Sequence, residues 1–228
     1  MTKIAIFAAA GMAVSATASA DLTGATHTNI LTAGQYTLTA TPLDAPDFSG
    51  ILGTAYSNMD PGPNGYVAFA AAGGAIGFDD YDSIATGGNI DLQSYRFVGG
   101  VDVAGGVAFF EFYDASSNFV DSFGVAFPQS GNFIWTITIS GFPGAISVPD
   151  AGIHQIVTDA AGSFGPAAQG QWFLGDAGPT VGSEDNTFGG TGDGTFSHNF
   201  EINGDFIPAP ASLALLGLGG IAAVRRRR

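Results

Sequence analysis

The stretch Phe133-Ile134-Trp135-Thr136-Ile137-Thr138-Ile139-Ser140 alternates between apolar and polar side chains. Its odd positions are Phe, Trp, Ile and Ile, and from residue 136 its even positions are Thr, Thr and Ser. Successive side chains of a β-strand point to opposite faces, so this pattern predicts a strand with one face in a core and one facing solvent.

Similar runs recur along the chain, separated by segments rich in Gly, Pro, Asn and Asp. The expected strands are Tyr36–Thr41, Tyr66–Ala71, Ala75–Phe78, Gln93–Val98, Val107–Tyr113, Phe119–Phe127, Ile153–Thr158, Trp172–Leu174 and Phe196–Ile202. A parallel α/β fold needs helical crossovers, and no 3.6-residue apolar stripe occurs between the two ends of the chain. The sequence therefore predicts an all-β fold, an antiparallel β-sandwich of jelly-roll type.

The charge is distributed very unevenly. All 20 acidic residues lie between Asp21 and Ile207, against a single basic residue, Arg96, which gives this segment a formal charge of −19. Such a surface repels phosphate backbones and argues against binding of nucleic acid. The chain has no cysteine, which excludes disulfides, thiolate zinc sites and cysteine nucleophiles.

The N-terminus has the features of a secretory signal peptide over residues 1–20. Lys3 provides a positive start, an apolar run follows, and Ala18 and Ala20 fit the small-x-small cleavage pattern. We therefore expect export through the secretion machinery, with a mature acidic domain over residues 21–207.

The C-terminal segment, residues 208–228, combines a proline motif, an apolar stretch and a basic end. The motif is Pro208, Ala209 and Pro210, the stretch from Ala211 to Val224 carries no charge, and the chain ends in Arg225, Arg226, Arg227 and Arg228. Arginine clusters stay on the cytoplasmic side of a membrane, so we expect a short membrane-spanning helix that leaves the domain outside.

This tail resembles the PEP-CTERM sorting signal of exported bacterial proteins. The resemblance covers roughly the last 22 residues, and the central Glu of the family motif is replaced here by Ala209. It implies an exosortase-like membrane protease that cuts near Pro208, and a destination at the cell surface or in the extracellular matrix. It implies nothing about the chemistry of the domain.

Catalytic motifs are missing from the sequence. His27, His154 and His198 have no ligand-like spacing, and no nucleophile elbow, phosphate-binding loop or dinucleotide fingerprint occurs. His198 falls on the apolar side of its expected strand, where a core or rim histidine is a simpler interpretation than a metal ligand. An outward-facing Glu111 is the ordinary interpretation of its expected strand, and Arg96, the only cation of the domain, is its candidate partner. We expect the protein not to be an enzyme.

Two acidic clusters form a candidate calcium site, the one cofactor that the sequence suggests. The first follows an expected strand and the second lies in a predicted long surface loop over residues 175–195. Calcium prefers six to eight hard oxygens, which crowded carboxylates supply, although solvated turn residues are the simpler interpretation. The residues concerned are Asp79, Asp80, Asp82, Glu184, Asp185 and Asp193.

Sugar binding is the other class of function that the sequence leaves open. Jelly-roll modules often bind sugars through exposed aromatic rings, and an envelope polysaccharide is the candidate partner here. Trp172 follows a polar run and is the candidate platform, although core packing is the simpler interpretation of this ring. Tyr81, Tyr95 and Tyr113 are the alternatives, whereas Trp135 is expected in the core. The leading hypothesis is an exported, non-catalytic structural or adhesive protein, and the alternative is a carbohydrate-binding module with structural calcium.

Overall fold

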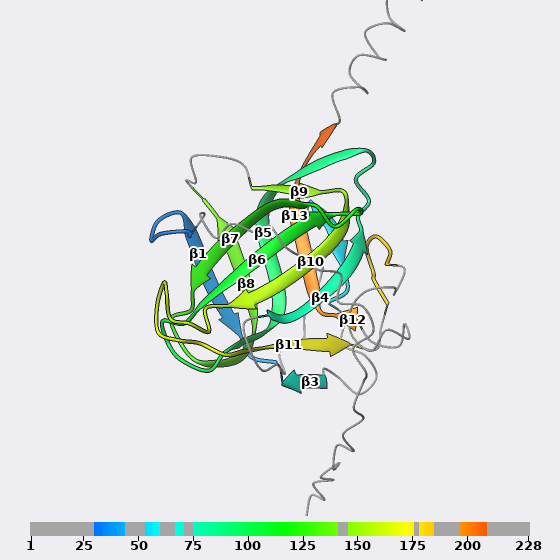
Figure 1. The fold of residues 1–228 in the computed structure, drawn as a ribbon. Helices are drawn as coiled ribbons and strands as arrows, with labels where there is room; N and C mark the ends of the chain where they lie inside the picture. The colour runs from blue at the N-terminus through cyan, green and yellow to red at the C-terminus, as the bar shows by residue number, and fades with distance from the viewer. Residues whose placement is uncertain are drawn as a thin grey trace, which may run out of the picture.

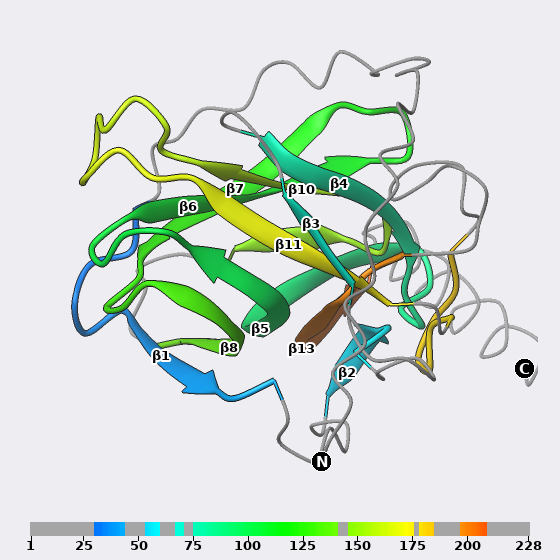
Figure 2. The same cartoon turned by 90° about the horizontal axis from the view of Figure 1, so that it is seen from below.

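The computed structural model of the chain describes residues 30–43, 53–59, 67–70, 75–140, 146–175, 178–184 and 197–208. Within these residues the fold consists of two antiparallel sheets and no helix, which confirms the all-β prediction. Figures 1 and 2 show the two sheets facing each other as in a sandwich. The predicted signal peptide and the C-terminal segment beyond Pro208 lie outside the described residues, and no described helix is long and apolar enough to cross a membrane.

The smaller sheet has four strands in the order β4-β10-β6-β7. Strand β6 (Val107–Asp114) and strand β7 (Phe119–Ala126) form a hairpin, and β10 (Ala151–Thr158) lies between β6 and β4 (Ala75–Asp82). Strand β4 is longer than the sequence predicted, because it continues through the acidic residues 79–82 instead of ending before them.

The larger sheet is organised around β5 (Gly88–Val101), the longest strand of the fold. One edge of β5 pairs with β8 (Gly131–Ile139) and β9 (Ser147–Pro149), and the other with β13 (Phe200–Pro208) and β11 (Gly170–Gly175). The outer strands are β1 (Tyr36–Thr41) on β8, β2 (Thr54–Ser57) on β13, and β3 (Val67–Ala70) and β12 (Ser197–His198) on β11.

The alternation of apolar and polar side chains over residues 133–140 decides how β8 packs. Trp135 and Ile137 are buried in the main core between the sheets, with Phe133 and Ile139 packed against its margin. Trp135 also donates its indole N–H to the carbonyl oxygen of Gly99 at 3.1 Å, so the one polar group of this buried side chain has a partner. Ile134, on the opposite face, belongs to a second small apolar cluster, so the outer face is not wholly polar.

Two strands were not predicted, β2 and β9. They contain only four and three residues, and neither has enough alternation to stand out in a sequence. Both are added to strands already in place, β2 to β13 and β9 to β5. Short strands of this kind form because a neighbouring strand offers unpaired backbone groups, a condition that exists only after folding.

Candidate functional site

The two acidic clusters predicted from the sequence meet at one end of the sandwich. Asp82, the last residue of β4, forms an antiparallel bridge with Ser183, in which each backbone N–H donates to the other's carbonyl oxygen at 2.7 and 2.8 Å. Glu184 follows directly, so carboxylates more than 100 positions apart in the sequence become neighbours. Asp185 and Asp193 lie outside the described residues.

A pocket opens at this bridge. Its volume is about 280 Å³, and it is lined by the carboxylate-bearing residues Asp80, Asp82 and Glu184, together with Ser183 and apolar side chains from three segments. An anionic hollow of this size attracts cations electrostatically. Among the described residues, no group of three His, Asp or Glu side chains converges closely enough to hold a metal ion by itself.

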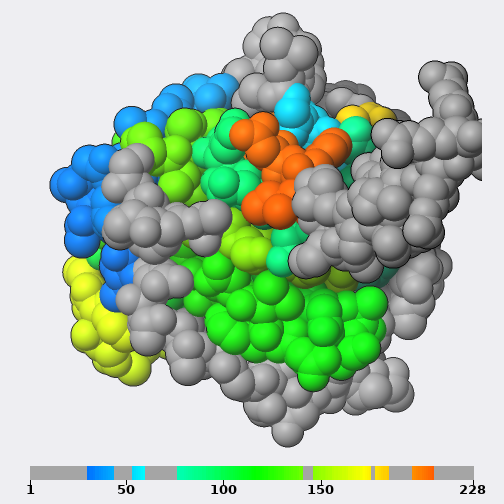
Figure 3. Space-filling model, turned by 90° about the horizontal axis from the view of Figure 1, so that it is seen from above, coloured from blue at the N-terminus to red at the C-terminus, as the bar shows by residue number. Residues whose placement is uncertain are grey.

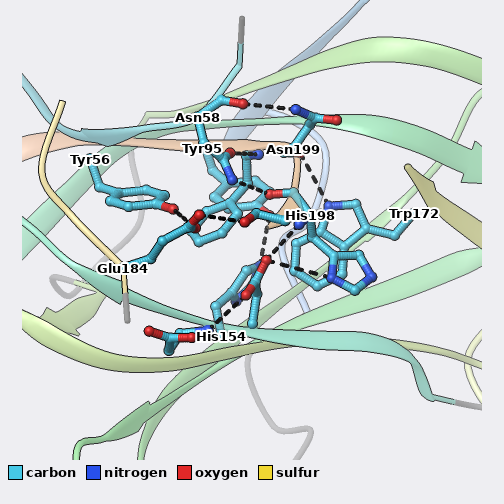
Figure 4. Close-up of polar contacts among 12 residues, drawn as sticks. Tyr56, Asn58, Tyr95, His154, Trp172, Glu184, His198 and Asn199 are labelled. Carbon is cyan, nitrogen blue, oxygen red and sulfur yellow. Dashed lines mark hydrogen bonds and ion pairs between the residues drawn. The ribbon is translucent and has the colours of Figure 1, made fainter. Parts of the chain in front are cut away.

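Behind the pocket, Glu184 is held by two hydroxyl donors. The Tyr56 hydroxyl donates to Glu184 Oε2 at 2.9 Å (Figure 4), and the Ser197 hydroxyl donates to Oε1. Burial, followed by the charge of Glu184, raises the pKa of Tyr56 well above its usual range, so the phenol stays protonated and remains a donor. Tyr56 lies in the unpredicted strand β2, which is why sequence reasoning missed it.

Asp79 lies deeper, between the sheets. Its Oδ2 accepts the backbone N–H of His198 at 2.5 Å, and its Oδ1 accepts the N–H of Asp80 at 3.0 Å. Burial raises the pKa of Asp79 well above its usual range, and the charge of nearby Glu184 raises it further. Asp79 is therefore an interior carboxyl group that burial biases towards its neutral form, not one of a group of solvated turn acids.

His198 is a core histidine, as the apolar side of its strand predicted. Its ring lies 4.1 Å from that of Trp172, centroid to centroid, and covers Gly77, where a Cβ would come within 2.5 Å of Nε2. Its Nδ1 has no hydrogen-bond partner and lies 3.6 Å from Asp79 Oδ2. Burial lowers the pKa of His198 to about 3, and the nearby His154 acts in the same direction, so we assign His198 as neutral at pH 7.

His154 forms the second interior polar pair, with Tyr95 on the opposite sheet. Its Nδ1 lies 3.0 Å from the carbonyl oxygen of Glu111 and its Nε2 lies 2.6 Å from the Tyr95 hydroxyl. Burial lowers the pKa of His154 to about 3. A carbonyl can only accept, so Nδ1 carries the proton of the neutral ring and Nε2 accepts from Tyr95.

The aromatic residues proposed for sugar binding are buried. Trp172 has 0% of its surface exposed and donates its indole N–H to the carbonyl oxygen of Asn199 at 3.1 Å. The ring therefore packs in the core, as the simpler interpretation of the sequence had it, and cannot be a surface platform. Tyr81, Tyr95 and Tyr113 are buried as well. The polar run before Trp172 was a misleading signal, because β11 lies between β5 and β3 with its Trp side chain turned into the core.

The expected ion pair of Arg96 with Glu111 is also corrected. Arg96 lies 3.3 Å from Glu201, which is fully buried and directly opposite it on the neighbouring strand. Glu201 further accepts hydrogen bonds from Ser57 and Asn203 at 3.0 and 2.9 Å. Glu111 instead accepts the Tyr113 hydroxyl at 2.7 Å. Strand register, which the sequence does not give, decides this pairing.

The sorting motif beyond Pro208, the membrane stop and the signal cleavage site lie outside the described residues. Pro208 is the last residue of β13 and pairs with Gly88, so the described part of the domain runs directly into the motif without a linker. Comparison of the chain with family models, with curated proteins and with solved structures found no match.

Proposed function

We propose that this chain is an exported, non-catalytic protein of the cell envelope or extracellular matrix, in which the β-sandwich is a structural or adhesive module. The secretion machinery would deliver it, the C-terminal segment would hold it in the membrane, and an exosortase-like protease would trim it at Pro208–Pro210. The observation that carries the proposal is the tail itself: 14 uncharged residues followed by four arginines, beginning where the last strand ends.

The interior of the domain fits a structural role. Its buried carboxyl groups and imidazoles mostly bond to hydroxyl groups, amides or the backbone, for example Glu201 to Ser57 and His154 to Tyr95. Satisfied polar networks of this kind make a core rigid and specify one arrangement. We also propose that the sandwich is of jelly-roll type. An experimental structure covering the residues outside the described ranges would test that topology.

Fractionation of the native cells, followed by intact-mass measurement, tests the assigned route. We expect a membrane-bound precursor that lacks residues 1–20, and an extracellular form that ends near Pro208. An extracellular form that retains Arg225 to Arg228 would refute the trimming, and a cytoplasmic full-length chain with Met1 intact would refute export.

One observation favours calcium binding, which belongs to the alternative hypothesis of a carbohydrate-binding module with structural calcium. The bridge between Asp82 and Ser183 places carboxylates from both predicted clusters around one pocket. Carboxylates brought together in this way repel one another until a cation binds, and backbone carbonyls and water would complete the coordination. The sugar-binding part of the alternative loses its candidate platform, because Trp172 is buried.

The calcium proposal predicts that millimolar calcium raises the melting temperature of the chelator-treated protein. Asp82→Asn should abolish that increase in melting temperature. Asp102→Asn should leave it intact, because it removes an exposed carboxylate that follows the last residue of β5 and does not line the pocket. Equal melting curves with and without calcium would remove this candidate function.

A further inference from the structure

Exposed apolar side chains are concentrated at the end of the sandwich from which the C-terminal segment continues. Four large hydrophobic residues of the described part of the chain are exposed: Ile84, Phe164, Phe206 and Ile207. Phe206 and Ile207 are the last two residues before Pro208, and each has 46% of its surface exposed. Ile84 is 54% exposed and lies in the loop between β4 and β5.

Although Ile84 is more than 120 positions away in the sequence, the fold holds it at the same end. Asp150 fastens both ends of its loop, accepting the Ser83 N–H at its backbone oxygen (2.8 Å) and the Gly87 N–H at Oδ2 (2.6 Å). The next residue, Gly88, is the ladder partner of Pro208. Figure 3 views this end of the molecule, with the final strand β13 at the surface. We call Ile84, Phe206 and Ile207 the apolar rim.

The predicted membrane span is short, which requires the rim to lie close to the bilayer. Fourteen helical residues from Ala211 to Val224 cover about 21 Å at 1.5 Å per residue, against a hydrocarbon core of about 30 Å. The three uncharged residues from Pro208 to Pro210 can add at most about 10 Å to that length. Nearly all of the sequence after Ile207 is therefore needed to cross the core, which leaves Phe206 and Ile207 at its boundary.

The backbone of this strand end tolerates the edge of a bilayer. Phe206 and Ile207 are paired with Ile90 and Asn89 of β5, so one edge of this strand end lies in a ladder. On its other edge the described part of β2 pairs only with residues 201–203, so the peptide groups there depend on the water of the headgroup layer. Unsatisfied peptide groups are the main obstacle to placing a non-helical chain near lipid. Asp205, which shares a strand face with Ile207, is exposed and binds Gln93. A charge at that position limits the depth to the hydrated headgroup layer.

We propose that the apolar rim docks on the surface of the membrane that holds the tail, so that the precursor lies against the bilayer instead of moving freely on a tether. This proposal rests on the proposed function, because it requires the tail to be inserted. From Ile207 to Ala211 the chain spans at most about 14 Å, which leaves the rim no position far from the headgroups. Docking also places Pro208 and Pro210 at the depth where a membrane protease works.

Single fluorescent labels on the full chain test the docking. The protein has no cysteine, so Ile84→Cys and Ser130→Cys each give one labelling position. Ser130 is exposed in the turn between β7 and β8, at the opposite end of the sandwich. The labelled chains are reconstituted in phosphatidylcholine vesicles that contain a quencher attached to lipid. We expect the label at 84 to be quenched several-fold more strongly than the label at 130.

The label at position 84 gives the decisive signal. Residue 84 is more than 120 positions from the tail in the sequence, so its label comes near the membrane only if the rim docks. Adding Phe206→Ser and Ile207→Ser to the Ile84→Cys chain should lower quenching to the level at 130, while the protein still floats with the vesicles. Equal quenching at 84 and 130 in floating protein, or quenching that survives both serine substitutions, would overturn the docking alone. A chain that does not float with vesicles would overturn the proposed function and the docking together.

Discussion

The hydrogen bond from Tyr95 to His154 allows a sharp test of the interior, through Tyr95→Phe. Both residues are fully buried, and the hydroxyl oxygen lies 2.6 Å from Nε2. The substitution keeps the ring and removes only the donor, so Nε2 is left with a buried, unmatched lone pair. Moving the ring proton to Nε2 gives no relief, because Nδ1 would then face the Glu111 carbonyl oxygen at 3.0 Å with a lone pair.

A buried polar atom left unsatisfied costs about 1–3 kcal/mol, so we expect Tyr95→Phe to lower the free energy of unfolding by about 2 kcal/mol. For a domain of this size, that corresponds to a fall in the melting temperature of about 4–8 °C. Chemical denaturation at pH 7 followed by circular dichroism measures the first quantity, and calorimetry measures the second.

Tyr36→Phe is the matched control. It makes the same chemical change at a half-buried hydroxyl, which donates to the carbonyl oxygen of Ala126 at 3.2 Å and lies where water can replace it. We expect a loss within about 0.5 kcal/mol, as for most surface substitutions. Equal losses in the two variants would refute the assigned tautomer and the role of the Tyr95 bond.

Three further predictions follow from the same interior. Burial lowers the pKa of His154 and of His198 to about 3, so between pH 6.5 and about 3 these imidazoles bind protons in the unfolded chain and not in the folded one. They therefore contribute a fall in the free energy of unfolding as the pH is lowered through that window, which the raised pKa of Asp79 opposes. Removing one imidazole in His198→Leu should reduce the histidine contribution to the slope. An unchanged slope in that variant would show that His198 does not titrate in this way. Gly204→Ala should destabilise the domain by about 2 kcal/mol or more in denaturant titrations, because its Cβ would lie 2.2 Å from a backbone oxygen of β5, whereas Gly178→Ala, with open space around it, should change little. Tryptophan emission of the native protein should resist quenching by iodide, since the indole of Trp172 is fully buried; strong quenching that Trp172→Phe abolishes would contradict that burial.

Alternation predicted the strands well wherever one face of a strand is buried. The bounds of β1 agree with the prediction, and β6, β7, β8 and β10 agree to within two residues at each end. The predicted strand at β4 ends too early, because Asp79, Asp80 and Asp82 are typical of turns although here they continue the strand. Charged residues in a strand are ordinarily a sign that it has ended, and here the partner strand β10 overrides that local preference.

The candidate site was predicted as residue types but not as an arrangement. The sequence singled out the acids at 79–82 and at 184, and the structure places Asp82 beside Ser183 and Glu184. The sequence did not mark Tyr56 or Ser197, whose hydroxyl groups bind Glu184. Nor did it indicate the pairing of Tyr95 with His154. No local pattern marks such residues, since each acts through a partner from a distant strand.

The sequence by itself determined the all-β class, the acidic character and the two end segments that predict export and anchoring. These properties depend on composition and short-range periodicity, which a chain carries before it folds. Only the tertiary structure decided that Glu201, not Glu111, pairs with Arg96, that Trp172 is enclosed, and that Ile84 joins Phe206 and Ile207 at one end. The physical reason is strand register: shifting one strand by a single residue exchanges its buried and exposed faces, and the choice is made by contacts between distant strands.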